Sequence, residues 1–129
     1  MFYVTKDFEF AASHSLREYD GPCQRLHGHN YKVEVTIKSE TLDKLGMVID
    51  FSKIKKICNE VIMKPYDHQN LNNIKPFDEL NPTAENMSKV FYTVISNALD
   101  TMKNNKNRAK VHSVKVWETS NSVAEYRED

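Results

Sequence analysis

The sequence is poor in the features that mark secreted, fibrous or membrane-spanning proteins. It has two cysteines and three glycines in 129 residues, and its first residues lack the basic and then apolar pattern of a signal peptide. Its most apolar later run, residues 90–95, is far too short to cross a bilayer. Two cysteines without a secretory signal favour a reducing compartment over a disulfide framework. We therefore expect a soluble cytoplasmic protein with no membrane partner.

An excess of one charge is also lacking. Lysine plus arginine and aspartate plus glutamate each number 18, and no block of like charge dominates. Nucleic acids and anionic membranes therefore have no electrostatic support as partners. The chain contains no repeat, low-complexity tract or flexible linker, so residues 1–129 are expected to form a single domain.

The most informative stretch holds two histidines one residue apart, His27 and His29. After them apolar and polar residues alternate from residue 31 to residue 38, which is typical of a half-buried strand. Both histidines share the parity of the apolar residues, so both imidazoles should point to one face. Gly28 faces the other way and leaves room for another backbone or a ligand.

A third histidine is predicted on the same kind of face. Residues 2–14 read as a first strand in which Phe8, Phe10, Ala12 and His14 share one parity. Catalytic zinc sites use three protein ligands, often imidazoles, and keep one coordination position open. His14, with the two histidines of the second strand, therefore forms a candidate zinc site at neighbouring strand ends.

Two helices are predicted after the second strand. Apolar residues recur at helical spacing after Asp50, a good N-cap, and Pro65 is expected to end this helix. Residues 81–86 open a second helix with the clearest amphipathic stripe of the chain.

The remaining strands complete the predicted fold. Residues 111–118 and 123–127 read as a third and a fourth strand, and residues 47–49 as a short return strand. The order strand, strand, helix, helix, strand, strand (ββααββ) indicates an α+β fold with both helices on one face of an antiparallel sheet. The other face carries a polar row on the second strand, which must meet either water or the inside of an assembly.

The two cysteines have different interpretations. Cys23 lies in a loop close in sequence to the histidines, and it is either a fourth ligand of a closed metal site or a free thiol that acts as base or nucleophile. Cys58 lies on the apolar stripe of the first helix and is interpreted as a small buried hydrophobe.

Two further groups are candidates for chemistry. Asp67 and His68 sit in a loop, either as an exposed turn or as a carboxylate-biased histidine that handles protons near neutral pH. Glu118 lies at a strand end, either exposed to solvent or partly buried to hold a ligand edge that donates two hydrogen bonds.

Five segments together resemble the 6-pyruvoyltetrahydropterin synthase superfamily over nearly the whole chain. They are Phe10-Ala11-Ala12-Ser13-His14, Cys23-x-x-x-His27-Gly28-His29, Asp67-His68, Asn81-Pro82-Thr83-Ala84-Glu85 and Trp117-Glu118-Thr119. The three-residue spacer after the cysteine resembles the bacterial 6-carboxytetrahydropterin synthase branch, since the pyruvoyl-forming enzymes typically have a longer one. The presence of Cys23 disfavours the branch that cleaves the side chain for folate synthesis.

The resemblance implies a tunnelling fold (T-fold) with a four-stranded antiparallel sheet. It implies a hexamer of two trimers with active sites at subunit interfaces, and the polar row would then line a central tunnel. The roles it implies are zinc binding by His14, His27 and His29, proton transfer by Cys23, Asp67 and His68, and pterin anchoring by Glu118.

The activity that the resemblance implies is a zinc-dependent lyase reaction. It converts 7,8-dihydroneopterin triphosphate and water to 6-carboxy-5,6,7,8-tetrahydropterin, acetaldehyde and triphosphate, on the route to queuosine and related 7-deazaguanines. Two alternatives stay open: formation of 6-pyruvoyltetrahydropterin, and a non-catalytic zinc-stabilised pterin-binding protein. Residues that bind the triphosphate are not identifiable, and the candidates are Arg17, Arg25, Lys32 and Arg127.

Overall fold

The computed structural model describes residues 1–128 of the chain. Five strands and three α-helical segments follow one another in an α+β order, with short 3₁₀ and π turns between them. The strands are β1 (Phe2–His14), β2 (His27–Ser39), β3 (Gln69–Asn70), β4 (Lys110–Thr119) and β5 (Ser122–Tyr126). The helices are α1 (Phe51–Cys58), α2 (Lys64–Tyr66) and α3 (Ala84–Asp100), and the turns are η1 (Pro22–Gln24), η2 (Asn59–Met63) and η3 (Leu71–Asn73).

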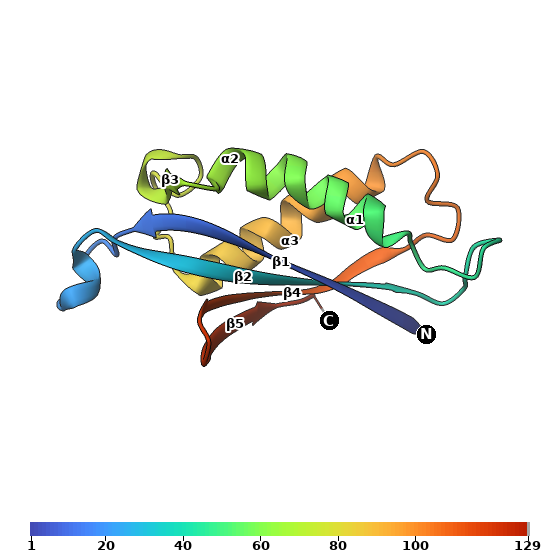
Figure 1. The fold of residues 1–129 in the computed structure, drawn as a ribbon, viewed down its shortest axis with the longest axis horizontal. Coiled ribbons are helices and arrows are strands. Elements are labelled where there is room, and N and C mark those ends of the chain that lie inside the picture. The colour runs from blue at the N-terminus through green and yellow to red at the C-terminus, as the bar shows by residue number, and fades with distance from the viewer. Residues whose placement is uncertain (129) are drawn as a thin grey trace.

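The sheet confirms the predicted α+β class and the ββααββ order of its long elements. Its strand order is β3-β1-β2-β4-β5, and the four long strands pair antiparallel. A short fifth strand adds to the four that the sequence predicts: β3 pairs parallel with β1 at Ala12 and Ser13. Helices α1 and α3 lie together on one face of the sheet (Figure 1).

The core lies between that face and the helices. The odd-numbered residues of β2 from Tyr31 to Ile37 are buried, and α3 packs Met87, Phe91 and Ile95 against the sheet side. The opposite face carries the polar row, in which Lys32 reaches Asp7 and Glu34 at 3.9 and 3.4 Å. The alternation read from the sequence therefore separates a core face from a polar face.

Two local predictions are wrong. The first helical run does not end before Pro65 but passes through the π turn η2 and ends at Tyr66. The N–H of Lys64 there bonds to the carbonyl of Asn59, five residues back, and this wider turn relieves the clash between a proline ring and the preceding turn.

The expected return strand at residues 47–49 is a bend that follows the turn at residues 44–45. Asp43 accepts a hydrogen bond from the N–H of Met47, which closes the turn. Val48 and Ile49 are buried in the core without strand pairing. Their apolar character therefore reflects burial rather than a β-strand.

The start of α3 brings a loop close to the strand ends. Thr83 is the N-cap, and its hydroxyl accepts the N–H of Asn86, which satisfies one free donor of the first turn. Pro82 precedes this cap and presents its carbonyl to the end of β1. Among the described residues, none of the helices has the length and apolar character that a membrane span requires.

Candidate metal centre and catalytic residues

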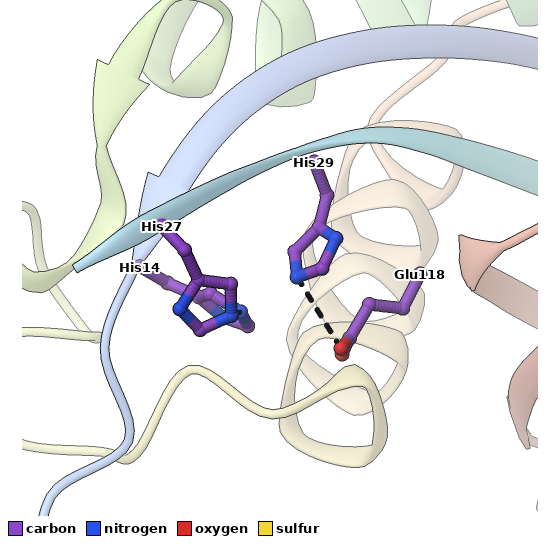
Figure 2. A group of neighbouring side chains, drawn as sticks. All are labelled: His14, His27, His29 and Glu118. Atoms are coloured by element: carbon purple, nitrogen blue, oxygen red, sulfur yellow. Dashed lines mark hydrogen bonds and ion pairs between the residues drawn. The ribbon is translucent and has the colours of Figure 1, made fainter. Parts of the chain in front are cut away.

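Three histidines and one glutamate gather at the end of the sheet. His14 ends β1, His27 and His29 begin β2, and Glu118 lies near the end of β4. The β1–β2 register pairs His14 directly with His27, and one ligand atom from each of the four residues lies within 4.8 Å of the others. Figure 2 shows the four side chains converging. The structure thus brings the three predicted ligands together, while their role in metal binding stays a prediction.

Backbone carbonyls fix the tautomers of two histidines. The Nδ1 atom of His14 lies 2.7 Å from the carbonyl oxygen of Pro82, and the Nδ1 atom of His27 lies 2.7 Å from that of Arg25. A carbonyl can only accept, so both Nδ1 atoms carry the proton. Each Nε2 then presents a lone pair, as a metal-binding histidine does when its other nitrogen is held by a second partner.

The two Nε2 atoms face each other at 3.1 Å, a distance that two lone pairs do not favour. Burial lowers the pKa of both His14 and His29, which favours the neutral form that binds metal ions. A cation shared between the rings would remove the repulsion. The donor set therefore fits a divalent metal ion.

His29 and Glu118 supply the other side of the group. Their Nε2 and Oε1 atoms lie 3.3 Å apart, yet the buried Nε2 has no hydrogen-bond partner among the described residues. A bound cation would give this nitrogen a partner, and three imidazoles with a carboxylate are donors that Zn²⁺ accepts. Glu118 is thus placed where it can face either a cation or a bound ligand, and its predicted pterin-anchoring role stays a prediction.

Asp67 and His68 form a dyad at the edge of β1. One Asp67 oxygen accepts the N–H of Ala11 at 3.0 Å, and the other lies 3.0 Å from Nδ1 of His68. The bond from Ala11 is the main cause that lowers the pKa of Asp67, so this carboxylate is ionised at neutral pH. It orients His68 with Nε2 directed away from the carboxylate. His68 adopts a left-handed conformation (φ 61°).

The dyad and the histidine group share only a surface hollow. Gly28, His29 and His68 line a hollow of about 430 Å³ beside β3. No ion pair or hydrogen bond among residues 1–128 joins the dyad to the three histidines. Within one chain the dyad and the histidine group therefore meet at this hollow without a direct bond.

Cys23 lies in the turn η1 with a free, half-buried thiol. In the part of the chain that the structure describes, the potential ligand group contains Glu118 and not Cys23. The interpretation of Cys23 as fourth ligand thus has no support from the geometry, and the role of its free thiol stays a prediction. Cys58 is buried as expected, and burial raises its pKa to about 12, so it is an inert thiol.

The Arg17 guanidinium is held by the loop before α3, and its role as a candidate for triphosphate binding stays a prediction. Its guanidinium donates to the carbonyls of Phe77 at 2.6 Å and Leu80 at 3.4 Å. Nearby, Asn81 accepts the N–H of Arg17 and Asn72 accepts that of Ser15. These contacts tie the loop before α3 to the end of β1 and so hold the Pro82 carbonyl against His14. The sequence marks the Asn81-Pro82 segment as the start of a helix but carries no signal for these long-range contacts.

Replacing Arg17 by glutamine is expected to lower the free energy of unfolding by about 1–3 kcal/mol, because the loop carbonyls lose a charged donor. Urea unfolding of the metal-free protein measures the change. Arg25→Gln, at an exposed position, is the matched control and should shift stability by less than about 0.5 kcal/mol. Equal losses in the two variants would contradict the tethering role.

The similarity of the sequence to known proteins defines the family. A family model described as 6-pyruvoyl tetrahydropterin synthase matches residues 3–129, and the chain belongs to this family of pterin enzymes. The predicted family and enzyme class are thereby confirmed.

The individual relatives fall under two enzyme names. The chain is 32% identical to the 6-carboxy-5,6,7,8-tetrahydropterin synthase of Haemophilus influenzae, over 99% of this chain and 100% of that protein. It is 34% identical to the protein of that name from Bacillus subtilis, over 98% and 85%. It is also 32% identical to the 6-pyruvoyl tetrahydrobiopterin synthase of Homo sapiens, over 96% and 90%.

A solved structure confirms the tunnelling fold. The 6-pyruvoyl tetrahydropterin synthase of Caenorhabditis elegans superposes with a TM-score of 0.83 at 25% identity, covering 99% of this chain and 96% of that one. The fold and family are therefore established together.

Proposed function

We propose that this protein is a zinc-dependent 6-carboxy-5,6,7,8-tetrahydropterin synthase. Its reaction is 7,8-dihydroneopterin triphosphate plus water to 6-carboxy-5,6,7,8-tetrahydropterin, acetaldehyde and triphosphate, in the supply of queuosine precursors. The observation that carries the proposal is the group of three imidazoles that converge beside Glu118, two of which direct Nδ1 to a backbone carbonyl. The three-residue spacer after Cys23 and the names of the bacterial relatives support this product over the pyruvoyl one.

His14, His27 and His29 would hold the zinc ion, which when bound supplies Lewis-acid polarisation of side-chain oxygens of the pterin. Cys23 is the proposed base that removes a proton from the carbon next to such an oxygen, and its place on a surface turn leaves it accessible.

Asp67 and His68 form the proposed proton-exchange pair. The 3.0 Å contact with Asp67 holds Nδ1 of His68, so Nε2 is free to exchange a proton with the substrate or the thiol. Glu118 is the proposed anchor for the aminopyrimidinone edge of the pterin, which donates two hydrogen bonds to a carboxylate. The side chain is oxidised as the ring is reduced, so the reaction is internally balanced and needs no nicotinamide.

The proposed assembly is a hexamer of two trimers with active sites between subunits. The surface hollow lined by His29 and His68 supports this, because a neighbouring copy would cover it. The polar row around Lys32 and Glu34 would line the central tunnel.

The alternative activity is formation of 6-pyruvoyltetrahydropterin, supported by the 32% identity with the human enzyme of that type. The two activities differ in their products. Zinc-loaded protein incubated with 7,8-dihydroneopterin triphosphate is expected to release acetaldehyde and 6-carboxytetrahydropterin in equal amounts, with the Cys23→Ala variant as the control.

Two other outcomes of this product assay would favour the alternatives. Triphosphate release without acetaldehyde would establish the pyruvoyl product instead. Binding of the pterin without any turnover would favour the non-catalytic binding protein.

A further inference from the structure

Buried polar atoms without a partner point to a ligand contact beyond the four residues of the metal centre. Such atoms among the described residues are Nε2 of His29, the hydroxyl of Tyr31 and Nε1 of Trp117. Trp117 lies on the polar side of the sheet, but His29 and Tyr31 are successive residues on the core face of β2. Buried polar groups without a partner are uncommon, and a missing water, ion or ligand is one of the usual reasons.

Tyr31 is part of the wall of the histidine group. Its ring lies 5.4 Å from that of His29 and 5.8 Å from that of His14, measured between centroids. Phe10 stacks on it at 5.1 Å and fixes the ring plane. The side chain is 0% exposed, so bulk water does not satisfy its hydroxyl.

The chemistry of the hydroxyl limits what it can contact. The side chain is a phenol, whose hydroxyl carries a proton near neutral pH. A neutral phenol donates through O–H, and its partner must therefore be an acceptor. The neighbouring imidazoles His14 and His27 already direct Nδ1 to backbone carbonyls, and their Nε2 atoms face each other.

We propose that Tyr31 is a ligand-binding residue, whose hydroxyl donates a hydrogen bond to an oxygen atom of the molecule bound among His14, His29 and Glu118. Where that oxygen belongs to the pterin side chain, the inference rests on the function proposed above. In the ligand-free protein the Tyr31 hydroxyl is therefore buried without a partner, which lowers the free energy of unfolding.

The test compares Tyr31→Phe with the matched control Tyr66→Phe. Both substitutions remove one buried hydroxyl, but that of Tyr66 already donates to the carbonyl of Lys75 at 3.3 Å and lies in the core under the helices. In the metal-free protein, Tyr31→Phe should leave the thermal midpoint equal or higher, because it removes an orphaned group. Tyr66→Phe should lower the midpoint.

The second arm uses Co²⁺-loaded protein and acetohydroxamate, an oxygen-donor probe, with binding read from the visible cobalt spectrum. Tyr31→Phe should weaken probe binding about tenfold, the change expected from one hydrogen bond, and Tyr66→Phe should leave it within about twofold. The probe contains no pterin, so failure of the proposed pterin reaction is distinguishable from failure of this inference.

Several results would overturn it. These are equal probe affinity in Tyr31→Phe and the parent protein, no probe binding to either, or a fall in the midpoint of metal-free Tyr31→Phe as large as that of the control. A protein that does not take up cobalt would overturn the inference together with the metal centre. Weaker probe binding with retained stability supports it.

Discussion

The Cys23→Ala variant is expected to lose turnover by about 10²–10⁴-fold and to keep its zinc. The range is the usual contribution of a positioned proton-transfer group. Zinc should be retained because the converging ligand atoms come from the histidines and Glu118 rather than from this thiol. The measurements are acetaldehyde release and metal content of the purified variant.

Cys58→Ala is the control, because it removes a thiol that lies outside the proposed site. This cysteine is buried in α1, so its replacement should lower stability and leave the rate within about twofold. Iodoacetamide should modify Cys23 in the zinc-loaded parent protein and spare Cys58. Full activity in Cys23→Ala would refute its role as a base, and loss of zinc from it would reinstate the cysteine as a ligand.

The His14→Ala variant is expected to lose more than about 100-fold in zinc affinity. Loss of a residue that only orients a metal ligand typically lowers metal affinity by about 10–100-fold. His14 is proposed as a ligand itself, so its loss should have a larger effect. In the parent protein, zinc at about 100 times its Kd should add about 2.7 kcal/mol to the free energy of unfolding. That increment should disappear in the variant.

The test depends on how much zinc raises the free energy of unfolding of each variant, and not on the stability of the metal-free variants. Removing the buried His14 also leaves the Pro82 carbonyl without its donor, so the metal-free variant is destabilised whatever the metal does. His112→Ala is the control histidine, on β4 and in edge contact with Tyr3 away from the group. A zinc increment that survives in His14→Ala would contradict the proposed ligand role.

The sequence predicts this fold well because its signals are periodic. Alternation in β2 gives the buried face directly, and the matching parity of His14 in β1 predicts which side of the sheet the histidines share. Family motifs then identify the T-fold.

Other features depend on contacts that have no periodic signal. The two-residue strand β3 exists because the dyad region pairs with β1 at Ala12 and Ser13, far away in sequence. Likewise, the carbonyl of Pro82 meets His14 only after the loop before α3 has folded back over Arg17. The orphaned hydroxyl of Tyr31 resembles any apolar strand position until its surroundings are known.

The direct pairing of His14 with His27 has a consequence for folding fidelity. β1 and β2 form a 13-residue antiparallel ladder from Phe2↔Ser39 to His14↔His27, closed by a long loop. Slippage by one residue would turn every side chain of one strand to the opposite face. A cation bound by His14, His27 and His29 would select against the slipped hairpin, because only the native alignment unites all three donors.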